Sequence, residues 1–508
     1  MVQIIIIVLY FALTVAIGMW SSKKSKTSDS FHGAEMGLFA IVCASAGEWL
    51  GGTATTGVSE YGFVYGLSGA WYTIANGIGV MFLALLFAKL YRSLTTVTVP
   101  GILERFFGLK ARTVSSVLLT IVMLAVGLSQ MIAAGKLGQS LLGFDFTVTV
   151  IVFAIIFIVY TLAGGMNAVS STNKLHLIVM YGGVIVAIFF ALGLVNGWDG
   201  FVGGIREVEA ADTTKDYFNM FSIGGTKVSS WIIAGLLGAC TAQAGIQPVL
   251  AAKDVKTAKK ACIITAFVAA PFGFFSALLG MIAKVMSNNG TLTDIAGNLV
   301  TDGKLALPTM MMHLPPVVGG LVLASILAAI LSTVSPIILS AGTMITKDLY
   351  QRVIKPDASD KEVLKMSRIT TALAGVICAV GAIFLVNASA VLDLIYAAYS
   401  LRGAIFVVAL FGFYWKRASQ KGACWSMVLT GIVAVGWVAV KLITGSYPIV
   451  IGSFAITETY AAVVVAAVCT IVFSKIFPAS QAELDAFVPT KQIIAEAAAR
   501  EAAKKAEA

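Results

Sequence analysis

Long apolar runs make up most of this sequence. About thirteen of them reach the roughly 20 predominantly apolar residues that a helix needs to cross a bilayer. Only 12% of the 508 residues are charged, whereas about a quarter are charged in soluble domains. A spanning backbone must satisfy its own polar groups, and the runs lack the two-residue alternation of a β-barrel. The sequence therefore predicts an all-α polytopic membrane protein.

The expected spans alternate with loops of contrasting charge. The spans are expected at 2–21, 37–65, 68–91, 113–142, 147–164, 173–195, 229–250, 261–286, 315–345, 367–386, 389–413, 421–442 and 457–476. Lysine and arginine cluster in the loops after the first, third, seventh, ninth and eleventh spans. Because positively charged loops stay in the cytoplasm, we expect a protein of the cell's inner membrane with its N-terminus outside and its C-terminus cytoplasmic. The net charge of +10 needs no nucleic-acid partner, since no basic block alternates with aromatic residues.

Two of the expected spans are interrupted by small and polar residues. The span at 37–65 contains SAGEWLGGTATTG, and the span at 229–250 contains LLGACTAQAGIQP. A matched pair of interrupted helices in two halves of a chain is typical of a transporter built from inverted repeats, with its site near the membrane midplane. The alternative is that these glycines only allow neighbouring helices to pack closely.

The segment at 326–350 carries hydroxyl groups along an apolar helix. Ser332 and Thr333 are adjacent, and both could place an oxygen beside a small desolvated cation. Hydroxyls supply such hard ligands without the cost of burying a full charge. The alternative is that they bond to their own backbone or to a neighbouring helix, as Ser and Thr often do in membranes.

These motifs resemble the sodium/solute symporter family, nearest to its proline and pantothenate branch. The sequence AAILSTVS at 328–335 and TKDLY at 346–350 is similar to that branch's AAxxSTxS and TxDLY motifs. YTLAGG at 160–165, Gln247-Pro248 and FYWKR at 413–417 support the resemblance, which extends over residues 2–476.

The resemblance implies a LeuT-type fold, with two inverted repeats of five helices each and about 13 transmembrane helices. The repeats would occupy 37–195 and 229–413. An extra N-terminal helix with its basic loop would fill 1–36, an extracellular loop 196–228, two further helices 414–476 and a cytoplasmic tail 477–508. Alternating access driven by sodium is the implied mechanism.

The resemblance also implies the ligands of one sodium ion. Carried over to this sequence, they are the carbonyls of Gly47, Leu50 and Ala329 and the hydroxyls of Ser332 and Thr333. Many relatives have Asp where this chain has Asn173, and in some of them that Asp supports a second sodium. We therefore expect one ion per cycle here.

Two charged residues fall inside expected spans, where an ionisable side chain is a functional candidate by default. Glu48 is expected in the unwound part of the first interrupted helix, where it would support the ion site directly or through water, or would pair with a buried cation. Arg402 could clamp a substrate carboxylate. It could also form a standing ion pair with Asp393 or Glu48.

The remaining solute-site candidates are polar or aromatic. Asp393 and Tyr396 align with residues that bind sugar in the sugar-transporting branch, Gln130 and Gln243 are weaker candidates, and Trp49 adjoins Glu48. The proline branch has Trp where this chain has Cys240, so proline is an unsuitable substrate. Together with Arg402, this favours a small carboxylate-bearing solute, either an amino acid or an organic acid.

Other functions remain as alternatives. A proton carried by Glu48 could replace sodium in the same fold, or the chain could be a transporter-like sensor. An enzyme is not expected, because the sequence has no HExxH, GxSxG or P-loop motif. The histidines lack the spacing of a metal site. The expected partners are a small solute and the bilayer, with no obligatory protein partner.

Overall fold

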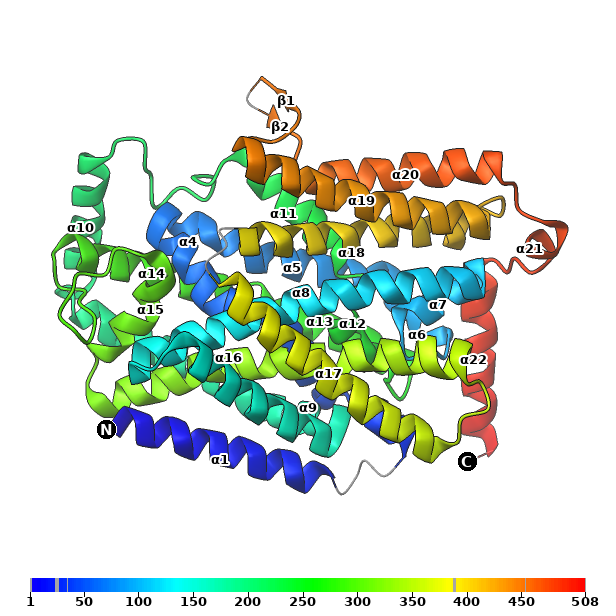
Figure 1. Ribbon diagram of the computed structural model, residues 1–508, viewed down its shortest axis with the longest axis horizontal. Coiled ribbons are helices and arrows are strands. Elements are labelled where there is room, and N and C mark those ends of the chain that lie inside the picture. Colours follow the sequence, from blue (N-terminus) through cyan, green and yellow to red (C-terminus); the bar gives the residue numbers. More distant parts are fainter. Residues whose placement is uncertain (1, 23–26, 34, 387–389, 453, 508) are drawn as a thin grey trace.

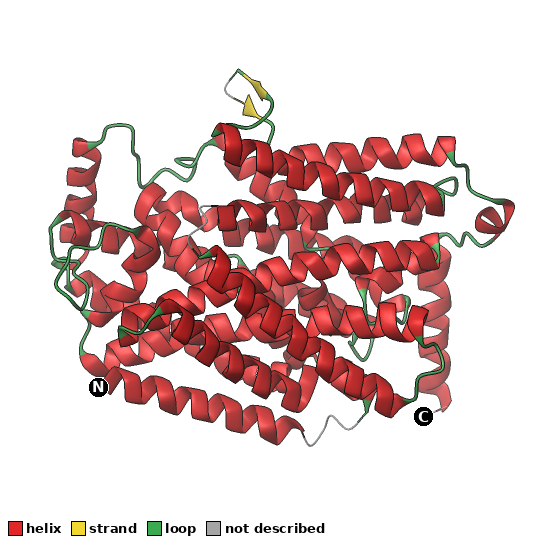
Figure 2. Ribbon diagram, in the orientation of Figure 1, coloured by secondary structure: helices red, strands yellow, loops and turns green. Residues whose placement is uncertain are grey.

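The computed structural model describes residues 2–22, 27–33, 35–386, 390–452 and 454–507. It does not describe the side chains of residues 22, 140–142, 163–164, 390–397, 442, 501 and 504–507. Within the described chain nearly every element is a helix, and most helices run along the long axis of the molecule (Figure 1). One two-stranded antiparallel hairpin, β1 (Val450–Ile451) and β2 (Phe454–Ala455), projects beyond the helices at the top of the view (Figure 2). The predicted all-α architecture is confirmed.

The first half of the chain forms helices in the following order. They are α1 (Val2–Ser22), α2 (Ser28–His32), α3 (Leu38–Trp49), η1 (Thr53–Gly57), α4 (Val58–Tyr65), η2 (Gly66–Ala70), α5 (Trp71–Phe82), η3 (Leu83–Phe87), α6 (Ala88–Ser93), α7 (Val99–Phe107), α8 (Leu109–Leu142), α9 (Phe146–Gly193) and α10 (Gly197–Ala211).

The second half continues with another series of helices. They are α11 (Gly225–Gly238), α12 (Gln243–Leu250), α13 (Val255–Ala269), α14 (Phe272–Asn288), α15 (Gly303–Met312), α16 (Pro316–Thr343), η4 (Met344–Ile354), α17 (Asp360–Leu385), α18 (Ala390–Tyr414), α19 (Gln420–Thr444), α20 (Glu458–Ile476), α21 (Gln481–Asp485) and α22 (Thr490–Glu507).

Ten helical stretches of the described chain are long and apolar enough to cross a membrane. Three shorter apolar helices, Leu38–Trp49, Phe146–Leu162 and Ala398–Tyr414, coincide with parts of further expected spans. The total of about 13 crossings therefore remains a prediction. The two termini lie at opposite ends of the bundle (Figure 1), as an odd number of crossings requires.

Both predicted helix interruptions are present. Helix α3 ends at Trp49, and the backbone resumes a helical course at η1 after the paired glycines. Helix α11 ends at Gly238, and α12 begins at Gln243 after a turn. Ser45 in α3 donates a hydrogen bond to the carbonyl of Gly245 in α12, at 2.8 Å, so the two interrupted helices are held together.

Three segments that the sequence predicts as loops contain helices. Residues 165–172, expected as a loop, are helical within α9, where Gly165 alone departs from helical angles with φ 54° and ψ −140°. Such a positive φ costs glycine little, and a Cβ there would lie 2.5 Å from the Phe31 carbonyl. The loops expected outside the membrane, at 196–228 and 287–314, contain α10 and α15. The alanine-rich tail forms α22, which packs on α6.

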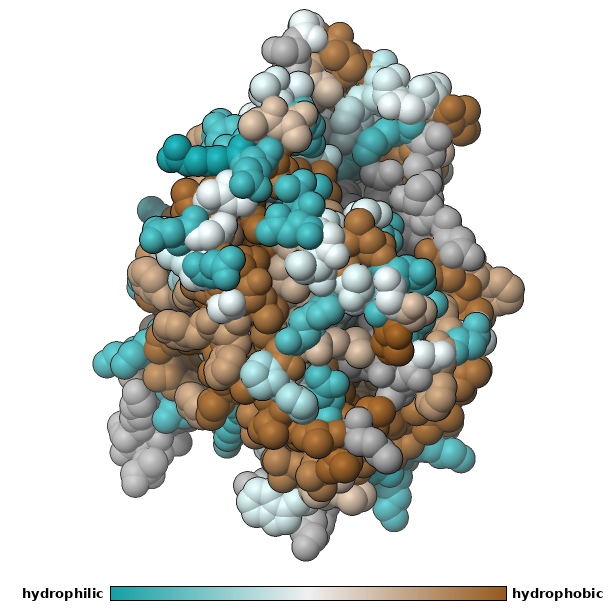
Figure 3. All heavy atoms as spheres, turned by 90° about the vertical axis from the view of Figure 1, so that its left-hand side faces the viewer, coloured by the Kyte–Doolittle hydropathy of each residue, from teal (hydrophilic) through white to brown (hydrophobic). Residues whose placement is uncertain are grey.

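Helix α16 is the centre of the bundle, and α1 lies at its edge. In the most apolar window of Pro316–Ile354, 83% of residues are buried, against 22% for Val2–Ser21. The end of the molecule near α10 and α15 presents hydrophilic side chains among hydrophobic ones (Figure 3). A hydroxyl-bearing helix at the centre of an apolar bundle must find its polar partners inside the protein. The candidate site lies around this helix.

Candidate functional site

The predicted sodium ligands meet where the first interrupted helix, at the break between α3 and η1, contacts α16. The hydroxyl of Thr333 donates a hydrogen bond to the carbonyl of Gly47. The carbonyl of Ala329 accepts hydrogen bonds from Ser332 Oγ at 2.8 Å and from Thr333 Oγ1 at 3.3 Å. The structure thus brings these four residues, which come from two distant segments, into one connected group of oxygens.

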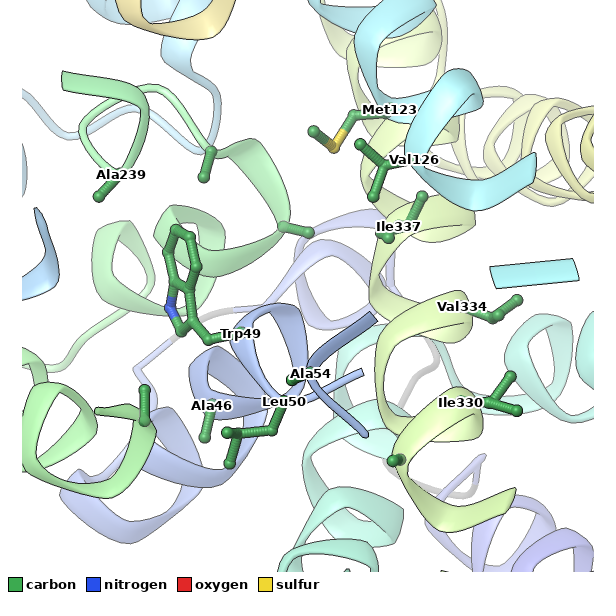
Figure 4. Close-up of a cluster of buried hydrophobic side chains, with 14 of the residues drawn as sticks. Ala46, Trp49, Leu50, Ala54, Met123, Val126, Ala239, Ile330, Val334 and Ile337 are labelled. Carbon is green, nitrogen blue, oxygen red and sulfur yellow. The ribbon is translucent and has the colours of Figure 1, made fainter. Parts of the chain in front are cut away.

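Two glycines allow this approach. A Cβ at Gly47 would lie 2.3 Å from the carbonyl oxygen of Ser332, and a Cβ at Gly51 would lie 2.2 Å from the hydroxyl oxygen of Thr333. Leu50, the remaining predicted ligand, is fully buried beside Gly51. It ends α3 with φ −110° and ψ 29°, outside the helical region. The backbone of this break therefore runs directly against α16, as Figure 4 shows for Leu50 and Ala54.

The chemistry of this group suits sodium. Sodium is a hard cation that prefers oxygen ligands, and carbonyls and hydroxyls can hold it without a permanent charge. Each hydroxyl here donates to a carbonyl of the same group and keeps lone pairs of its own. A cation among these oxygens would take both the carbonyl and the hydroxyl lone pairs, once the hydroxyl protons rotate away.

Asn173 lies directly beside the oxygen group. Its amide nitrogen donates to the carbonyl of Ser332 at 3.1 Å, and it is fully buried. Its amide oxygen has no hydrogen-bond partner among the described residues. Asn173 thus holds the backbone of α16 in place, and it contributes no negative charge.

Glu48 and Arg402 form an ion pair deep inside the bundle. Arg402 Nη1 lies 2.8 Å from Glu48 Oε1, and their side chains are only 3% and 2% exposed. Glu48 belongs to the last turn of α3, so its predicted place in the unwound stretch is wrong: the helix continues to Trp49. The sequence offers two partners for Arg402. The structure shows Arg402 paired with Glu48, and the side chain of Asp393 lies outside the described residues.

Aromatic rings surround the guanidinium of Arg402. Its Cζ lies 4.4 Å from the centre of the Tyr399 ring and 5.8 Å from the Trp49 ring, within the range of cation–π attraction. The hydroxyl of Thr241, in the break between α11 and α12, donates to the Arg402 carbonyl at 2.6 Å. Arg402 therefore joins both interrupted helices to α18. Figure 4 shows Trp49 between the segment that carries Ala239 and helix α16.

Three polar atoms of this cluster are buried without a hydrogen-bond partner among the described residues. They are Glu48 Oε2, Arg402 Nε and the indole nitrogen of Trp49. A buried polar group without a partner is costly, especially when it belongs to a charged side chain. One acceptor and two donors are consequently available to a bound molecule.

A second aromatic layer lies next to this cluster. The hydroxyls of Tyr72 and Tyr399 are 2.9 Å apart, and Trp231 packs edge-on against Tyr72 and Tyr61. Sequence reasoning missed these residues. Tyr399 lies three positions before Arg402 on one helix, and that spacing could have indicated it. Tyr72 and Trp231 give no comparable signal, because only the folded chain places them here.

Two of the predicted solute ligands have other partners. Gln130 accepts a hydrogen bond from the Gly52 amide at 2.8 Å and donates to Thr53 Oγ1 at 3.0 Å, so it fixes the break in the first helix. Gln243 donates to the carbonyl of Val97, in the loop before α7, and accepts from the amide of Val99, the first residue of α7. Tyr396, like Asp393, lies outside the residues whose side chains the structure describes.

The charged end of the hydroxyl-rich segment forms a separate ionic network. Buried Asp348 lies 2.6 Å from Arg112 and accepts a 2.7 Å hydrogen bond from Thr98. Glu104 in α7 pairs with Arg112 and lies 2.7 Å from Arg352. Partial burial of Glu104 opposes its ionisation, but hydrogen bonds from Arg352 and Arg112 outweigh this and lower its pKa.

The fold and the oxygen-lined break define a class of protein, the helical membrane transporters of the LeuT-type fold. A solved Na+-coupled sialic acid symporter superposes with a TM-score of 0.77 at 19% identity, over 95% of this chain and 99% of that one. The nucleobase-cation-symport transporter Mhp1 superposes with a TM-score of 0.57 at 13% identity, over 91% of this chain and 98% of that one. These similarities confirm the predicted fold.

The sequence itself gives the family. The profile of the Sodium:solute symporter family matches residues 31–431, and the chain belongs to that family. It is 26% identical to a sodium/glucose cotransporter of Vibrio parahaemolyticus, over 85% of this chain and 83% of that protein. It is 27% identical to sodium/myo-inositol cotransporter 2 of Oryctolagus cuniculus, over 84% of this chain and 68% of that protein. The chain is thus a multi-pass sodium-coupled transporter and not an enzyme, whereas its placement in the proline branch remains a prediction.

Proposed function

We propose that this protein carries a small organic solute into the cell together with one sodium ion, by alternating access between two inverted repeats at 37–195 and 229–413. The ion is held by the carbonyls of Gly47, Leu50 and Ala329 and the hydroxyls of Ser332 and Thr333. The main observation in support of the proposal is the hydrogen bond from Thr333 to Gly47, which joins α16 to the last turn of α3, beside the break.

The solute site of the proposal is the buried cluster of Glu48, Trp49 and Arg402. Glu48 and Trp49 follow Gly47 directly in α3, and Arg402 reaches them from α18. Sodium bound between α3 and α16 would fix the end of α3 and thereby the positions of Glu48 and Trp49. Each ligand would then raise the affinity of the other by the same factor, as linkage requires.

Two observations favour different solutes. The guanidinium of Arg402 favours a carboxylate, which supports an amino acid or an organic acid. The relatives named above carry glucose or myo-inositol in their names, which supports a sugar or a polyol. Gln130 and Gln243 are not part of the proposed solute site, because their amides bind the backbone and Thr53.

Uptake into proteoliposomes tests the coupling. We expect solute uptake driven by an inward sodium gradient, and no uptake when potassium or choline replaces sodium. Ser332→Ala should weaken the sodium dependence, because the Ser332 hydroxyl and its acceptor, the Ala329 carbonyl, are both proposed ligands. The matched control Ser335→Ala should not, because the Ser335 hydroxyl donates to the carbonyl of Leu331, which is not a proposed ligand. Uptake that follows a proton gradient in the absence of sodium would overturn the proposal in favour of proton coupling through Glu48.

The proposed orientation has the N-terminus outside the inner membrane and the tail in the cytoplasm. It rests on the lysine and arginine clusters of alternate loops. In this orientation the ionic network of Glu104, Arg112 and Asp348 is cytoplasmic. Labelling of single cysteines introduced at Lys110 and Asp294 in intact cells would test it. A membrane-impermeant reagent should reach only the position in the 287–314 loop.

A further inference from the structure

The ion pair between Glu48 and Arg402 uses only part of its hydrogen-bonding capacity. Two parallel bonds are the common geometry when arginine meets a carboxylate. Here Nη1 binds Oε1, while Oε2 and Nε have no hydrogen-bond partner among the described residues. The pair therefore leaves an acceptor on one side chain and a donor on the other.

The net charge of this cluster is zero within the described residues. Glu48 and Arg402 compensate each other, and the surrounding groups of Trp49, Tyr72 and Tyr399 are uncharged rings and hydroxyls. Sodium would lie on the α16 side of the broken helix, against Gly47, whereas Glu48 faces α18. A solute with a net charge would have to be buried here without a counter-ion, which is strongly unfavourable.

We infer that the solute site selects solutes of zero net charge that present a hydrogen-bond donor and an acceptor on neighbouring atoms. This inference rests on the proposed function and names the substrate class of its solute site. The donor of the solute binds Glu48 Oε2, its acceptor binds Arg402 Nε, and the indole N–H of Trp49 supplies one more donor. Simple organic-acid anions are excluded, although they contain the carboxylate that Arg402 alone would favour.

Two kinds of molecule satisfy this requirement. Adjacent hydroxyls of a sugar or polyol offer one O–H as donor and one oxygen as acceptor, without any charge. A zwitterionic amino acid offers an ammonium group to Glu48 and a carboxylate to Arg402, and its two charges cancel. The rings of Trp49 and Tyr399 beside the guanidinium offer an apolar face to the carbon skeleton of either molecule.

Thermal stability of the purified full-length protein tests the inference. The panel contains glucose, myo-inositol, neutral amino acids, and the anions acetate, lactate and pyruvate, each in sodium chloride and in potassium chloride. A ligand of the folded state raises the melting temperature. We expect a sodium-dependent rise in melting temperature with either a polyol or a zwitterionic amino acid, depending on which of the two is the solute. The monoanions should produce no rise. A rise with a monoanion and with no neutral solute would overturn the inference.

Charge variants sharpen the test. Glu48→Gln leaves Arg402 uncompensated, so binding of the neutral solute should weaken by about 10- to 100-fold while a monoanion gains binding. The double variant Glu48→Gln with Arg402→Gln restores neutrality and should lose the affinity for anions, which keeps the test usable where the single variant does not fold. Glu483→Gln, on the distant helix α21, is the matched control.

The inference and the proposed function fail in different ways. A sodium-specific rise in melting temperature in the absence of any solute tests the ion site alone. If that rise is present and Glu48→Gln leaves the charge preference of the solute unchanged, the inference is wrong and the symporter proposal stands. If no condition produces a sodium-specific rise or sodium-driven uptake, the proposed function itself is wrong.

Discussion

The hydroxyl of Thr333 donates a hydrogen bond to the carbonyl of Gly47, a residue 286 positions away in the sequence. Helix α3 ends at Trp49, so the carbonyls of its last turn are available to partners outside the helix. The bond therefore connects the last turn of α3 to α16, which belongs to the most buried of the ten membrane-spanning stretches of the described chain. An ion that replaces it would control the distance between these two elements.

Replacement of Thr333 by valine tests this connection. Valine keeps the branched shape and removes the hydroxyl, so one oxygen ligand is lost with little change in packing. A hydrogen bond or ligand to a charged group contributes about 1.5–3 kcal/mol, and we expect the half-saturating sodium concentration to rise by about 10- to 100-fold. A sodium titration of solute uptake measures this half-saturating concentration. An unchanged sodium dependence would show that Thr333 is not a ligand.

The close approach at Gly47 gives a steric prediction. A Cβ at this position would lie 2.3 Å from both Asn173 Nδ2 and the Ser332 carbonyl, so Gly47→Ala must push α3 away from α16. We expect loss of sodium-driven uptake and a lower melting temperature. Gly182→Ala is the control, because it lies in a helix with no atom within 4 Å of its Cβ. Equal behaviour of the two variants would contradict the packing described here.

The sequence predicted those features of the site that depend on local pattern. The breaks in two helices follow from glycine-rich interruptions of apolar runs, and Ser332 and Thr333 follow from adjacent hydroxyls in a buried helix. The sequence also predicts that Arg402 has a partner, because a charged side chain inside a span must be paired. It does not predict which residue is the partner, because that depends on how α3 and α18 meet in space.

The remaining features depend on contacts between distant segments. Gln243 lies in a polar interruption and resembles a solute ligand, yet it binds the backbone at Val97 and Val99. Gln130 likewise binds the break at Gly52 and Thr53. A buried amide must satisfy both its donor and its acceptor, and the sequence does not indicate whether backbone or solute does so.

Asn173 gives a prediction about ion number. One sodium per cycle predicts a Hill coefficient of about 1 for the sodium dependence of uptake. Asn173→Asp places a carboxylate beside the Ser332 carbonyl, where the Asn173 amide now donates. We expect that variant to bind sodium more tightly or to show a steeper sodium dependence, measured by the same titration. A Hill coefficient near 2 in the unmodified protein would contradict a single ion.

The ionic network at Glu104 predicts a pH dependence of stability. Arg352 and Arg112 hold the pKa of Glu104 below its ordinary value in the folded protein. A depressed pKa stabilises the fold above the unfolded-state pKa of about 4.3, and that contribution is lost as pH falls through the lower folded-state pKa. Glu104→Gln should therefore lower stability at pH 7. The pair with Arg352, whose side chain is 54% exposed, should contribute about 1 kcal/mol or less, and the more buried pair with Arg112 should contribute more.

The pH scan separates this effect from general destabilisation. The difference in melting temperature between the unmodified protein and Glu104→Gln should be constant at neutral pH and should shrink as pH falls below about 4. Glu496→Gln, on the exposed face of α22, is the matched control and should follow the unmodified protein throughout. A difference that stays constant down to pH 3 would mean that Glu104 acts through packing and not through its charge.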